Sequence, residues 1–321
     1  MIMWLAIVIP ILTLIIGIII ITYSSKIAVV NSARLASALG ISSLVIGITL
    51  VSIGTDISEI FNSIISCAMG HGDIDVGDSI GSVLTQLTFV FGLLPFICGV
   101  IHINRKEFLI IGACEVLSLI LVFTVVEKGY FTRFDAMFMI GSFFFYTLIT
   151  YNVTKSDMLE KVDLMKLDGD YKNKSILLIF AVAGFLGVAF SSYIIVQSII
   201  SLAALINIDE YLISFFILSI GTSLPELTVE LNALKSKEYN IAIGDVLGSC
   251  IVDSSISIAI GQLLFPQEVT ASLAIPTILY TLFASVVVVT LVSIRRKMDK
   301  KAGAVLIALY GGSFLMLFFL L

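Results

Sequence analysis

Ten apolar segments, each long enough to cross a lipid bilayer as a helix, follow one another along almost the whole chain. A spanning helix needs about 20 apolar residues, and segments of this kind lie at 2–23, 40–69, 76–101, 107–127, 134–153, 175–199, 207–234, 241–264, 270–294 and 302–321. The first segment lacks the basic start and small-residue cleavage site of a secretory signal. The chain is 59% hydrophobic and only 13% charged, unlike soluble domains. We therefore expect an all-α membrane protein with ten transmembrane helices.

Basic residues divide unequally between the two sets of loops that connect these segments. Of the 18 Lys and Arg residues, 16 fall in the odd-numbered loops, and only Lys128 and Arg133 fall in the others. Short cytoplasmic loops are enriched in Lys and Arg. We therefore expect a multi-pass protein of the cell membrane with the 154–174 loop in the cytoplasm and both termini outside. The net charge of −5 and the absence of a glycine-rich phosphate loop or zinc spacing give no indication of nucleic acid binding.

An acidic motif occurs twice in the sequence. "SIGTDISE" at 52–59 returns as "SIGTSLPE" at 219–226, and "GDSIGSVLTQ" at 77–86 returns as "GDVLGSCIVD" at 244–253, both 167 residues later. Each half holds five predicted spans, so the second copy must cross the membrane in the opposite direction, as in the inverted repeats of many secondary transporters. We expect two inverted five-helix repeats, at 1–153 and 175–321, joined by a cytoplasmic linker loop at 154–174.

Oxygen-bearing side chains line one face of each motif helix. Positions four or seven residues apart share a helix face. This spacing groups the following side chains: Ser52, Asp56 and Glu59; Ser219, Ser223 and Glu226; Thr55 with Glu59; Thr222 with Glu226; Ser82 with Gln86; and Ser249 with Asp253. Each motif therefore presents a polar stripe within an apolar helix.

Four of these side chains are carboxylates in the interior of predicted spans: Asp56, Glu59, Glu226 and Asp253. Burying a carboxylate at mid-membrane costs at least about 2.5–3.5 kcal/mol on insertion scales, and no Lys or Arg lies at that depth in the sequence. Bound cations or protons are the remaining compensators. Carboxylate, hydroxyl and amide oxygens suit hard ions such as calcium, magnesium or sodium. Gly54, Gly221 and Pro225 indicate locally broken helices, which free backbone carbonyls as further ligands.

Other polar residues have competing interpretations. The hydroxyls alone also fit a role as hydrogen-bonding contacts between helices. Asp78 and Asp245 each follow a glycine before an apolar stretch, which favours helix-start residues stabilised by the amide dipole, with attraction of ions at a cavity mouth as the alternative. Glu115 and Glu230 have no acidic counterpart at the 167-residue offset, and their roles stay open.

At these motifs the chain resembles the cation/calcium exchanger superfamily, whose members include sodium/calcium exchangers. The stretches "GTSLPE" and "GSCIVD" carry the resemblance almost letter for letter, and it extends to both halves. The resemblance implies a transporter rather than an enzyme, without an organic cofactor, that exchanges a divalent cation for sodium or protons by alternating access. It implies ligands at Ser52, Thr55, Asp56, Glu59, Ser82 and Gln86 in the first half, and at Ser219, Thr222, Ser223, Glu226, Ser249 and Asp253 in the second.

The first copy departs from the family pattern at three positions. Asp56 stands where the family usually has Ser, Ser58 where it has Pro, and Gln86 where it has Asn. The extra carboxylate adds negative charge to the expected cage, so the number of ions, the coupling ion and the divalent selectivity are open.

The expected function is antiport of a divalent cation, calcium first, against sodium. A proton-coupled divalent cation exchanger is the alternative within the same class, and a cation channel is a second alternative, because a channel also has an oxygen-lined path. An intramembrane aspartyl protease also needs acids at depth, but it leaves the duplicated motif without a reason. The expected partners are inorganic cations, carried as calcium and sodium ions or protons, and the lipid bilayer, in a chain that we treat as a monomer.

Overall fold

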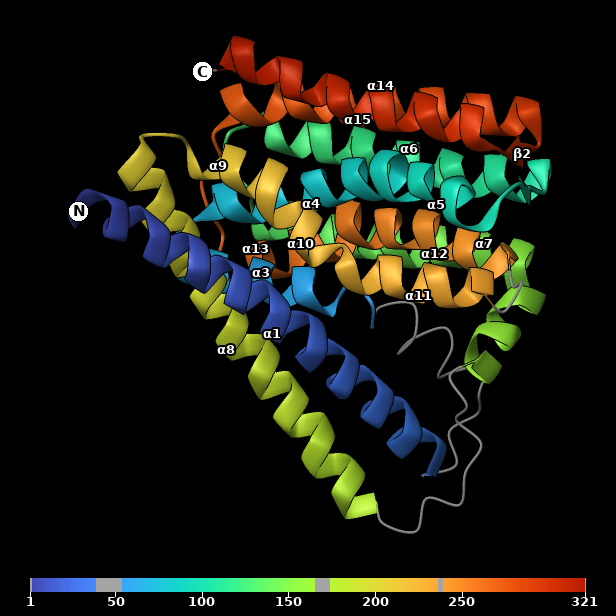
Figure 1. Ribbon diagram of the computed structural model, residues 1–321, viewed down its shortest axis with the longest axis horizontal. Coiled ribbons are helices and arrows are strands. Elements are labelled where there is room, and N and C mark those ends of the chain that lie inside the picture. Colours follow the sequence, from blue (N-terminus) through green and yellow to red (C-terminus); the bar gives the residue numbers. More distant parts are fainter. Residues whose placement is uncertain (1, 39–53, 165–173, 236–238, 321) are drawn as a thin grey trace.

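The computed structural model describes residues 2–38, 54–164, 174–235 and 239–320, and these residues are predominantly helical (Figure 1). Helices satisfy their own backbone polar groups, as a bilayer core requires. The elements of the first half are α1 (Ile2–Ala38), α3 (Ile57–Ala68), α4 (Gly72–Leu84), the π-helical segment η2 (Thr85–Val90), α5 (Phe91–Cys98), β1 (Ile101–His102), α6 (Arg105–Val126) and α7 (Arg133–Leu164). The elements of the second half are α8 (Lys174–Ile206), α9 (Glu210–Ile213), the π-helical segment η3 (Ser214–Leu218), α10 (Ser219–Thr222), α11 (Leu224–Lys235), α12 (Tyr239–Val252), the π-helical segment η4 (Asp253–Ser257), α13 (Ile258–Leu264), α14 (Ala271–Arg295), β2 (Lys297–Met298) and α15 (Lys300–Leu320).

Helices α1 and α8 form a long pair that projects obliquely from the other helices (Figure 1). Small residues allow their backbones to approach closely, because a Cβ added to Gly184 would lie 2.5 Å from the backbone nitrogen of Ala28. Thr13 and Ser198 join the two helices by a hydrogen bond of 2.8 Å between their hydroxyls. Small residues and hydroxyl contacts of this kind are typical of helix pairs in membranes. The pair is thus held by close packing rather than by charge.

Helix α4 lies at the centre of the remaining helices and packs against elements of both halves. Gly77 and Gly81 face the second half, where added Cβ atoms would lie 2.6 Å from the carbonyl oxygen of Tyr211 and 2.3 Å from that of Phe215. Two glycines four residues apart therefore let this helix approach η3 more closely than any residue with a side chain would allow. The motif residues of α4 are brought against those of the second half by this contact.

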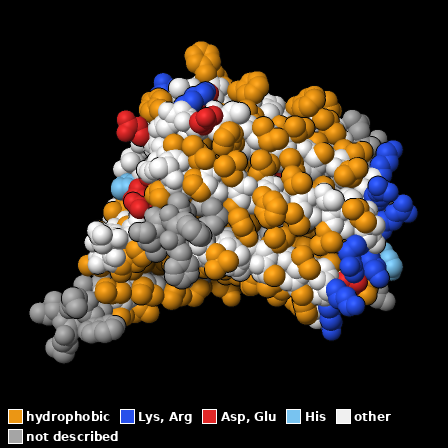
Figure 2. Space-filling model, turned by 90° about the horizontal axis from the view of Figure 1, so that it is seen from above, with side chains coloured by type: hydrophobic (Ala, Val, Ile, Leu, Met, Phe, Trp, Pro, Cys, Tyr) orange, Lys and Arg blue, Asp and Glu red, His pale blue; other side chains and the backbone are white. Residues whose placement is uncertain are grey.

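Seven described segments are long and apolar enough to cross a membrane, and each overlaps a predicted span: Ile7–Ala36, Gly72–Cys98, Arg105–Val126, Lys174–Ile206, Glu210–Leu234, Ala242–Leu264 and Ala271–Arg295. The first continues well beyond the predicted end at residue 23, because α1 remains helical to Ala38. The predicted span at 40–69 is described only from residue 54 onward, and its helix α3 has 12 residues. Figure 2 shows apolar side chains across the middle of the molecule, with charged groups gathered toward its ends. This distribution is that of a protein with a lipid-facing belt.

The linker prediction needs one correction. Helix α7 continues to Leu164, whereas the sequence was interpreted as a loop from residue 154. Residues 155–164 include Lys, Glu, Leu and Met, which are good helix formers, so their polarity marks the end of the apolar segment rather than the end of the helix. Residues 165–173 of the predicted linker lie outside the described residues.

Two short backbone pairings join the halves at opposite ends of α6. Before α6, β1 pairs antiparallel with β2, with Ile101 opposite Met298. After α6, Tyr130 forms an antiparallel bridge with Glu268. Residue 268 follows residue 101 by 167 positions, and residue 297 follows residue 130 by the same number, which is the offset of the acidic motifs. Equivalent segments of the duplication thus pair at both ends, with a register that differs by one residue, since Ile101 lies opposite Met298 and not residue 297.

Candidate cation site

The predicted ligand residues that the structure describes all lie in the protein interior. None of them is more than 7% exposed: Thr55, Asp56, Glu59, Ser82, Gln86, Ser219, Thr222, Ser223, Glu226, Ser249 and Asp253. Ser52, the remaining predicted ligand, lies outside the described residues. The polar stripes therefore face the core of the helix bundle and not the lipid, as expected for ionisable side chains in a membrane protein.

Each copy of the acidic motif has a short turn just before the helix that carries its glutamate. In the first copy the chain turns at residues 54–56, and α3 begins at Ile57 with Asp56 as its N-cap residue. In the second copy α10 ends at Thr222 and α11 begins at Leu224, with Ser223 between them. The helix break predicted from Gly221 and Pro225 is present in the second copy. In the first copy the turn at 54–56 lies at the equivalent place, and residues 39–53 lie outside the described residues.

The break places a glutamate at the start of each following helix. Glu59 lies in the first turn of α3, and Glu226 lies in the first turn of α11. The first turn of a helix presents unpaired backbone N–H groups and a partial positive charge, which stabilise a carboxylate. The starts of α3 and α11 thus offset part of the cost of burying these two acids.

The second pair of motifs contains a change of helical pitch. Helix α4 continues into η2, which contains Gln86, and α12 continues into η4, which begins at Asp253. The two π-helical segments occupy nearly equivalent places in the two halves. Single π-helical turns inside α-helices are rare and are frequent at functional sites. Nothing in the periodicity of the sequence predicted them.

Hydrogen bonds connect the candidate ligands of one half to those of the other. The contacts are Ser82 Oγ to Thr222 Oγ1 at 3.3 Å, Thr85 Oγ1 to Ser219 Oγ at 3.4 Å, Ser249 Oγ to Asp56 Oδ2 at 3.4 Å, and Gln86 Nε2 to Asp253 Oδ2 at 3.3 Å. Gln86 and Asp253 occupy equivalent positions of the duplication, 167 residues apart. So do Val83 and Cys250, and the Cys250 thiol lies 3.8 Å from the carbonyl oxygen of Val83. These two pairs mark the line along which the halves meet.

The four predicted acids form one electrostatic group. Glu226 interacts with the charges of Glu59, Asp56 and Asp253, and Asp253 interacts with those of Asp56 and Glu59. Among the described residues, no other side chain or amide donates a hydrogen bond to either carboxylate oxygen of Glu226. Glu59 Oε1 and Asp253 Oδ1 likewise receive none. Buried carboxylate oxygens without donors have capacity for a cation or a proton.

Positive side chains do not neutralise this group in the described part of the chain. The ion pairs there lie near helix ends, at His71–Glu210, Lys128–Asp135, Arg295–Asp299 and Lys297–Asp299. The described residues also contain no group of three His, Cys, Asp or Glu side chains close enough to hold a metal ion by themselves. A cation held here would therefore take hydroxyl, amide and backbone carbonyl oxygens as ligands together with carboxylates, as calcium and sodium can.

Asp78 and Asp245 are not helix-start residues, and that interpretation was wrong. Helix α4 begins at Gly72 and α12 begins at Tyr239, so both aspartates lie inside helices. The glycine before Asp78 packs closely against the second half, where a Cβ added to Gly77 would lie 2.6 Å from the carbonyl oxygen of Tyr211. Asp78 accepts hydrogen bonds from Thr222 at 3.0 Å and Asn62 at 3.1 Å. It thus orients a candidate ligand of the opposite half.

Two further acids lie beside the site. Glu115 is fully buried between α6 and α14 and accepts a hydrogen bond from Ser285 at 2.8 Å. Glu230 is fully buried on α11, one turn beyond Glu226.

The sequence pattern did not predict three further polar residues of the site: Asn62, Ser58 and Thr85. The spacing could have indicated Asn62, which lies seven residues from Thr55 and three from Glu59. Ser58 donates to Glu59 Oε2 at 2.8 Å.

Known proteins resemble this chain in sequence and in fold. The model of the sodium/calcium exchanger protein family matches residues 9–152 and 176–319. An uncharacterized membrane protein of Methanocaldococcus jannaschii is 33% identical over 36% of this chain and 41% of its own length. The sodium/calcium exchanger MaX1 of Methanosarcina acetivorans is 26% identical over 48% of this chain and 43% of its own length. This chain thus spans about two fifths of the curated relatives that it matches.

The solved structures include the sodium–calcium exchanger NCX_Mj soaked with Na⁺ and Sr²⁺. It is 23% identical to this chain, with a TM-score of 0.59, over 96% of this chain and 98% of the other. At this level of identity the likeness concerns the fold.

Proposed function

The chain belongs to the sodium/calcium exchanger protein family, and we propose that it is a secondary antiporter that exchanges calcium for sodium across the cell membrane. The single observation that carries this proposal is the group of buried oxygens that both halves contribute, with carboxylate oxygens of Glu59, Glu226 and Asp253 that no described residue satisfies. The name of the relative MaX1 supports the same pair of ions.

Calcium, as the transported substrate, would bridge Glu59 and Glu226. These glutamates begin the two broken helices and interact electrostatically across the halves. Asp56, Asp253, Gln86 and the surrounding hydroxyls would hold sodium ions when calcium has left. Two carboxylates about 4 Å apart repel by roughly 4 kcal/mol at an effective dielectric near 20. A site without cations or protons would therefore resist the closed, dry conformation through which exchange must pass, which links the movement of one ion to the movement of the other.

Ten spans in two inverted repeats would provide the two alternating conformations. The contacts between equivalent residues, Gln86 with Asp253 and Val83 with Cys250, support a two-fold axis through the site. The matched pairings at both ends of α6 support the same symmetry. Inverted halves that repack about a fixed site would open it first to one side and then to the other.

The basic end of the molecule would face the cytoplasm. The 16 basic residues of the odd-numbered loops favour this orientation. In Figure 1 the two termini lie at one end of the molecule, and β2, which contains Lys297, lies at the opposite end. This arrangement supports termini on the outer side.

A proton-coupled exchanger is the second candidate, because Asp56 adds a carboxylate that the resembling family usually lacks. The test is uptake of ⁴⁵Ca²⁺ into vesicles reconstituted with the purified protein, with protein-free vesicles as the control. A sodium gradient should drive uptake, and a pH gradient of equal size should not. Uptake driven by the pH gradient alone would show that protons, and not sodium, are the coupling ion. Calcium movement that responds to neither gradient would contradict antiport.

A further inference from the structure

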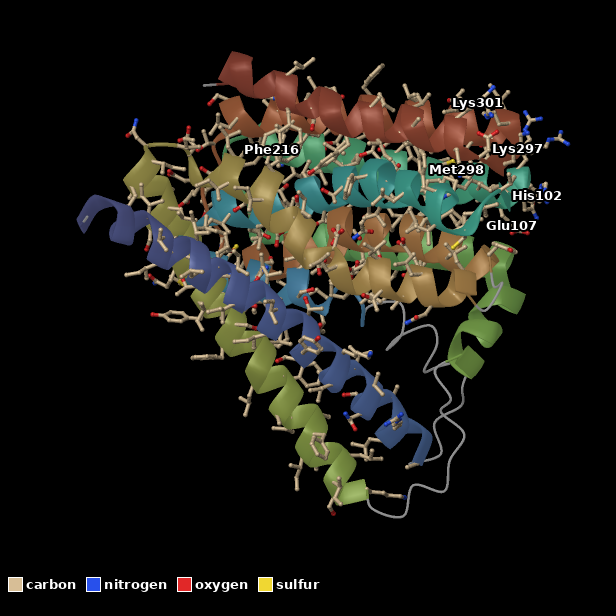
Figure 3. The ribbon with its side chains drawn as sticks, viewed as in Figure 1. His102, Glu107, Phe216, Lys297, Met298 and Lys301 are labelled. Carbon is tan, nitrogen blue, oxygen red and sulfur yellow. The ribbon has the colours of Figure 1, made fainter. Side chains whose placement is uncertain are left out.

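A basic surface lies at the end of the molecule where β1 pairs with β2. We define it by six exposed residues that come from both halves of the chain: Arg105, Lys106, Arg296, Lys297, Lys300 and Lys301. The β1–β2 pairing holds His102 opposite Lys297, and Figure 3 places both beside Lys301 and Glu107. Figure 2 shows Lys and Arg side chains gathered at the same end. The surface is therefore built by tertiary structure and not by one run of charge.

Few carboxylates balance this surface. Glu107 and Asp299 are the carboxylates of the two segments, 101–107 and 295–301, that carry seven cations when Arg295 is included. Asp299 accepts hydrogen bonds from the Ala302 amide at 2.9 Å and from Arg295 at 2.6 Å. The amide bond first, and then Arg295, hold the pKa of Asp299 below its ordinary value, so it stays ionised. An excess of positive charge remains on the surface.

Four of the cations occupy positions that oppose the helix dipole. Arg105 and Lys106 begin α6, and Lys300 and Lys301 begin α15. A cation in the first turn of a helix is unfavourable, because that end carries partial positive charge, whereas an anion is favourable there by about 0.3–1 kcal/mol. Both helix starts and the basic side chains around them therefore attract an anion.

An exposed apolar rim borders the basic surface on the membrane side. The exposed residues are Phe96, Ile97 and Val100 at and just beyond the end of α5, Leu109 in α6, and Ile294 at the end of α14, which is 69% exposed. Exposed apolar side chains on spanning helices contact lipid chains, and Lys and Arg beside them extend toward the phosphate layer. The basic surface thus lies at the depth of lipid headgroups.

The opposite end of the molecule shows that the equivalent pairing does not require this charge. There Tyr130 bridges Glu268, and the surrounding carboxylates outnumber the cations Lys128 and Arg133: Asp73, Glu127, Asp135, Asp209, Glu210 and Glu268. Lys128 is paired with Asp135 at 2.5 Å. The two antiparallel pairings of the halves therefore carry opposite charge, so the basic surface belongs to one leaflet only.

We propose that the basic surface binds the phosphate headgroups of anionic phospholipids in the leaflet at this end of the protein. Clusters of Lys and Arg beside spanning helices attract anionic lipids. The apolar rim would contact the acyl chains of the same lipid molecules. Bound headgroups would tie α6 to α15, and so the first half of the molecule to the second. The proposal is independent of which cations the protein exchanges.

The test is the thermal midpoint of the purified protein in dodecyl maltoside, followed by circular dichroism, as dioleoylphosphatidylglycerol is added. Preferential binding to the folded state raises the midpoint with lipid concentration and gives an apparent Kd. Dioleoylphosphatidylcholine at the same mole fraction should have no effect, and raising the salt should weaken the phosphatidylglycerol effect. Inorganic phosphate is the third arm. A midpoint shift from free phosphate equal to that from phosphatidylglycerol, or an equal shift from phosphatidylcholine, would contradict the proposal.

Two double variants provide matched removal of charge. Arg105→Gln/Lys301→Gln takes one cation from each segment and should raise the apparent Kd for phosphatidylglycerol by at least about fivefold. Lys26→Gln/Lys174→Gln removes two exposed cations from α1 and α8 and should leave it unchanged. Equal Kd values for the two variants would overturn the proposal. If the first variant does not fold, the single Lys301→Gln change should give a smaller increase, and Arg105→Lys should give none.

Discussion

The two copies of the acidic motif have the same backbone plan and the same number of predicted acids, but the acids occupy different positions. The first copy has Asp56 where the second has Ser223, and the second has Asp253 where the first has Gln86. Each additional aspartate lies against a neutral group of the other half, Asp56 against Ser249 and Asp253 against Gln86. The duplication thus sets the common backbone positions, and the departures from it place the two aspartates at non-equivalent positions in the two halves.

Removing the charge of Glu59 or Glu226, the glutamates at equivalent positions of the two copies, should have the largest effect. Glu226→Gln and Glu59→Gln each keep the shape of the side chain but remove the charge that calcium needs, so each should lower ⁴⁵Ca²⁺ flux at least about 100-fold, because a buried charged contact is worth several kcal/mol. Glu127→Gln, at an exposed position, is the matched control and should retain native flux. Native flux in either buried variant would remove both residues from the site.

Disturbing the close packing between the two halves should have the next largest effect, a loss of stability of the folded protein. Gly81→Ala adds a Cβ that would lie 2.3 Å from the carbonyl oxygen of Phe215, and it should destabilise the protein by about 1–3 kcal/mol. The measurement is the thermal midpoint in detergent. Gly141→Ala, on an exposed face of α7, should leave the midpoint nearly unchanged, and an equal loss in both variants would show that helical glycines matter here for another reason.

The carboxylate of Asp56 can be moved to the equivalent position of the other copy, which Ser223 occupies. Asp56→Ser should weaken calcium binding about tenfold, because one carboxylate of the interacting group is lost. Asp56→Ser/Ser223→Asp restores the number of acids in the equivalent place. If position matters, the double variant should recover calcium binding but change the amount of sodium needed for half-maximal calcium uptake. Full recovery of both properties would show that only total charge counts.

The smallest expected effect concerns the contact between equivalent positions. Gln86→Asn shortens the side chain by one methylene and should lose the 3.3 Å bond to Asp253, at a cost of about 1.5 kcal/mol for a hydrogen bond to a charged group. Calcium affinity should fall several-fold. Gln262→Asn shortens an amide that bonds Asp75 outside the site and should leave calcium affinity unchanged.

The sequence predicted the parts of the site that depend on residue type and spacing. The 167-residue offset, the broken helices at Asp56 and Ser223, and the inward polar stripes follow from glycine, proline and carboxylate positions in apolar helices. The structure bears out the broken helix at Ser223 and the inward stripes, and it places a turn at the equivalent residues 54–56 of the first copy. The family assigned from "GTSLPE" and "GSCIVD" is confirmed.

Features set by tertiary contact could not be predicted in this way. Asp78 was placed at a helix start because a glycine precedes it, whereas that glycine serves helix packing and Asp78 bonds Thr222 across the halves. The π-helical segments at Gln86 and Asp253 have no signature in apolar periodicity. The end of α7 was misplaced because loss of hydropathy was taken as loss of helix.

Whether Glu59 and Glu226 hold one calcium ion together is measured most directly by equilibrium ⁴⁵Ca²⁺ binding to a double-mutant cycle. Residues that share one ion are coupled, whereas independent sites give additive losses. The shared-site account predicts that Glu59→Gln/Glu226→Gln binds calcium no more weakly than the weaker single variant. Losses of binding free energy in the two single variants that add up in the double variant would contradict it.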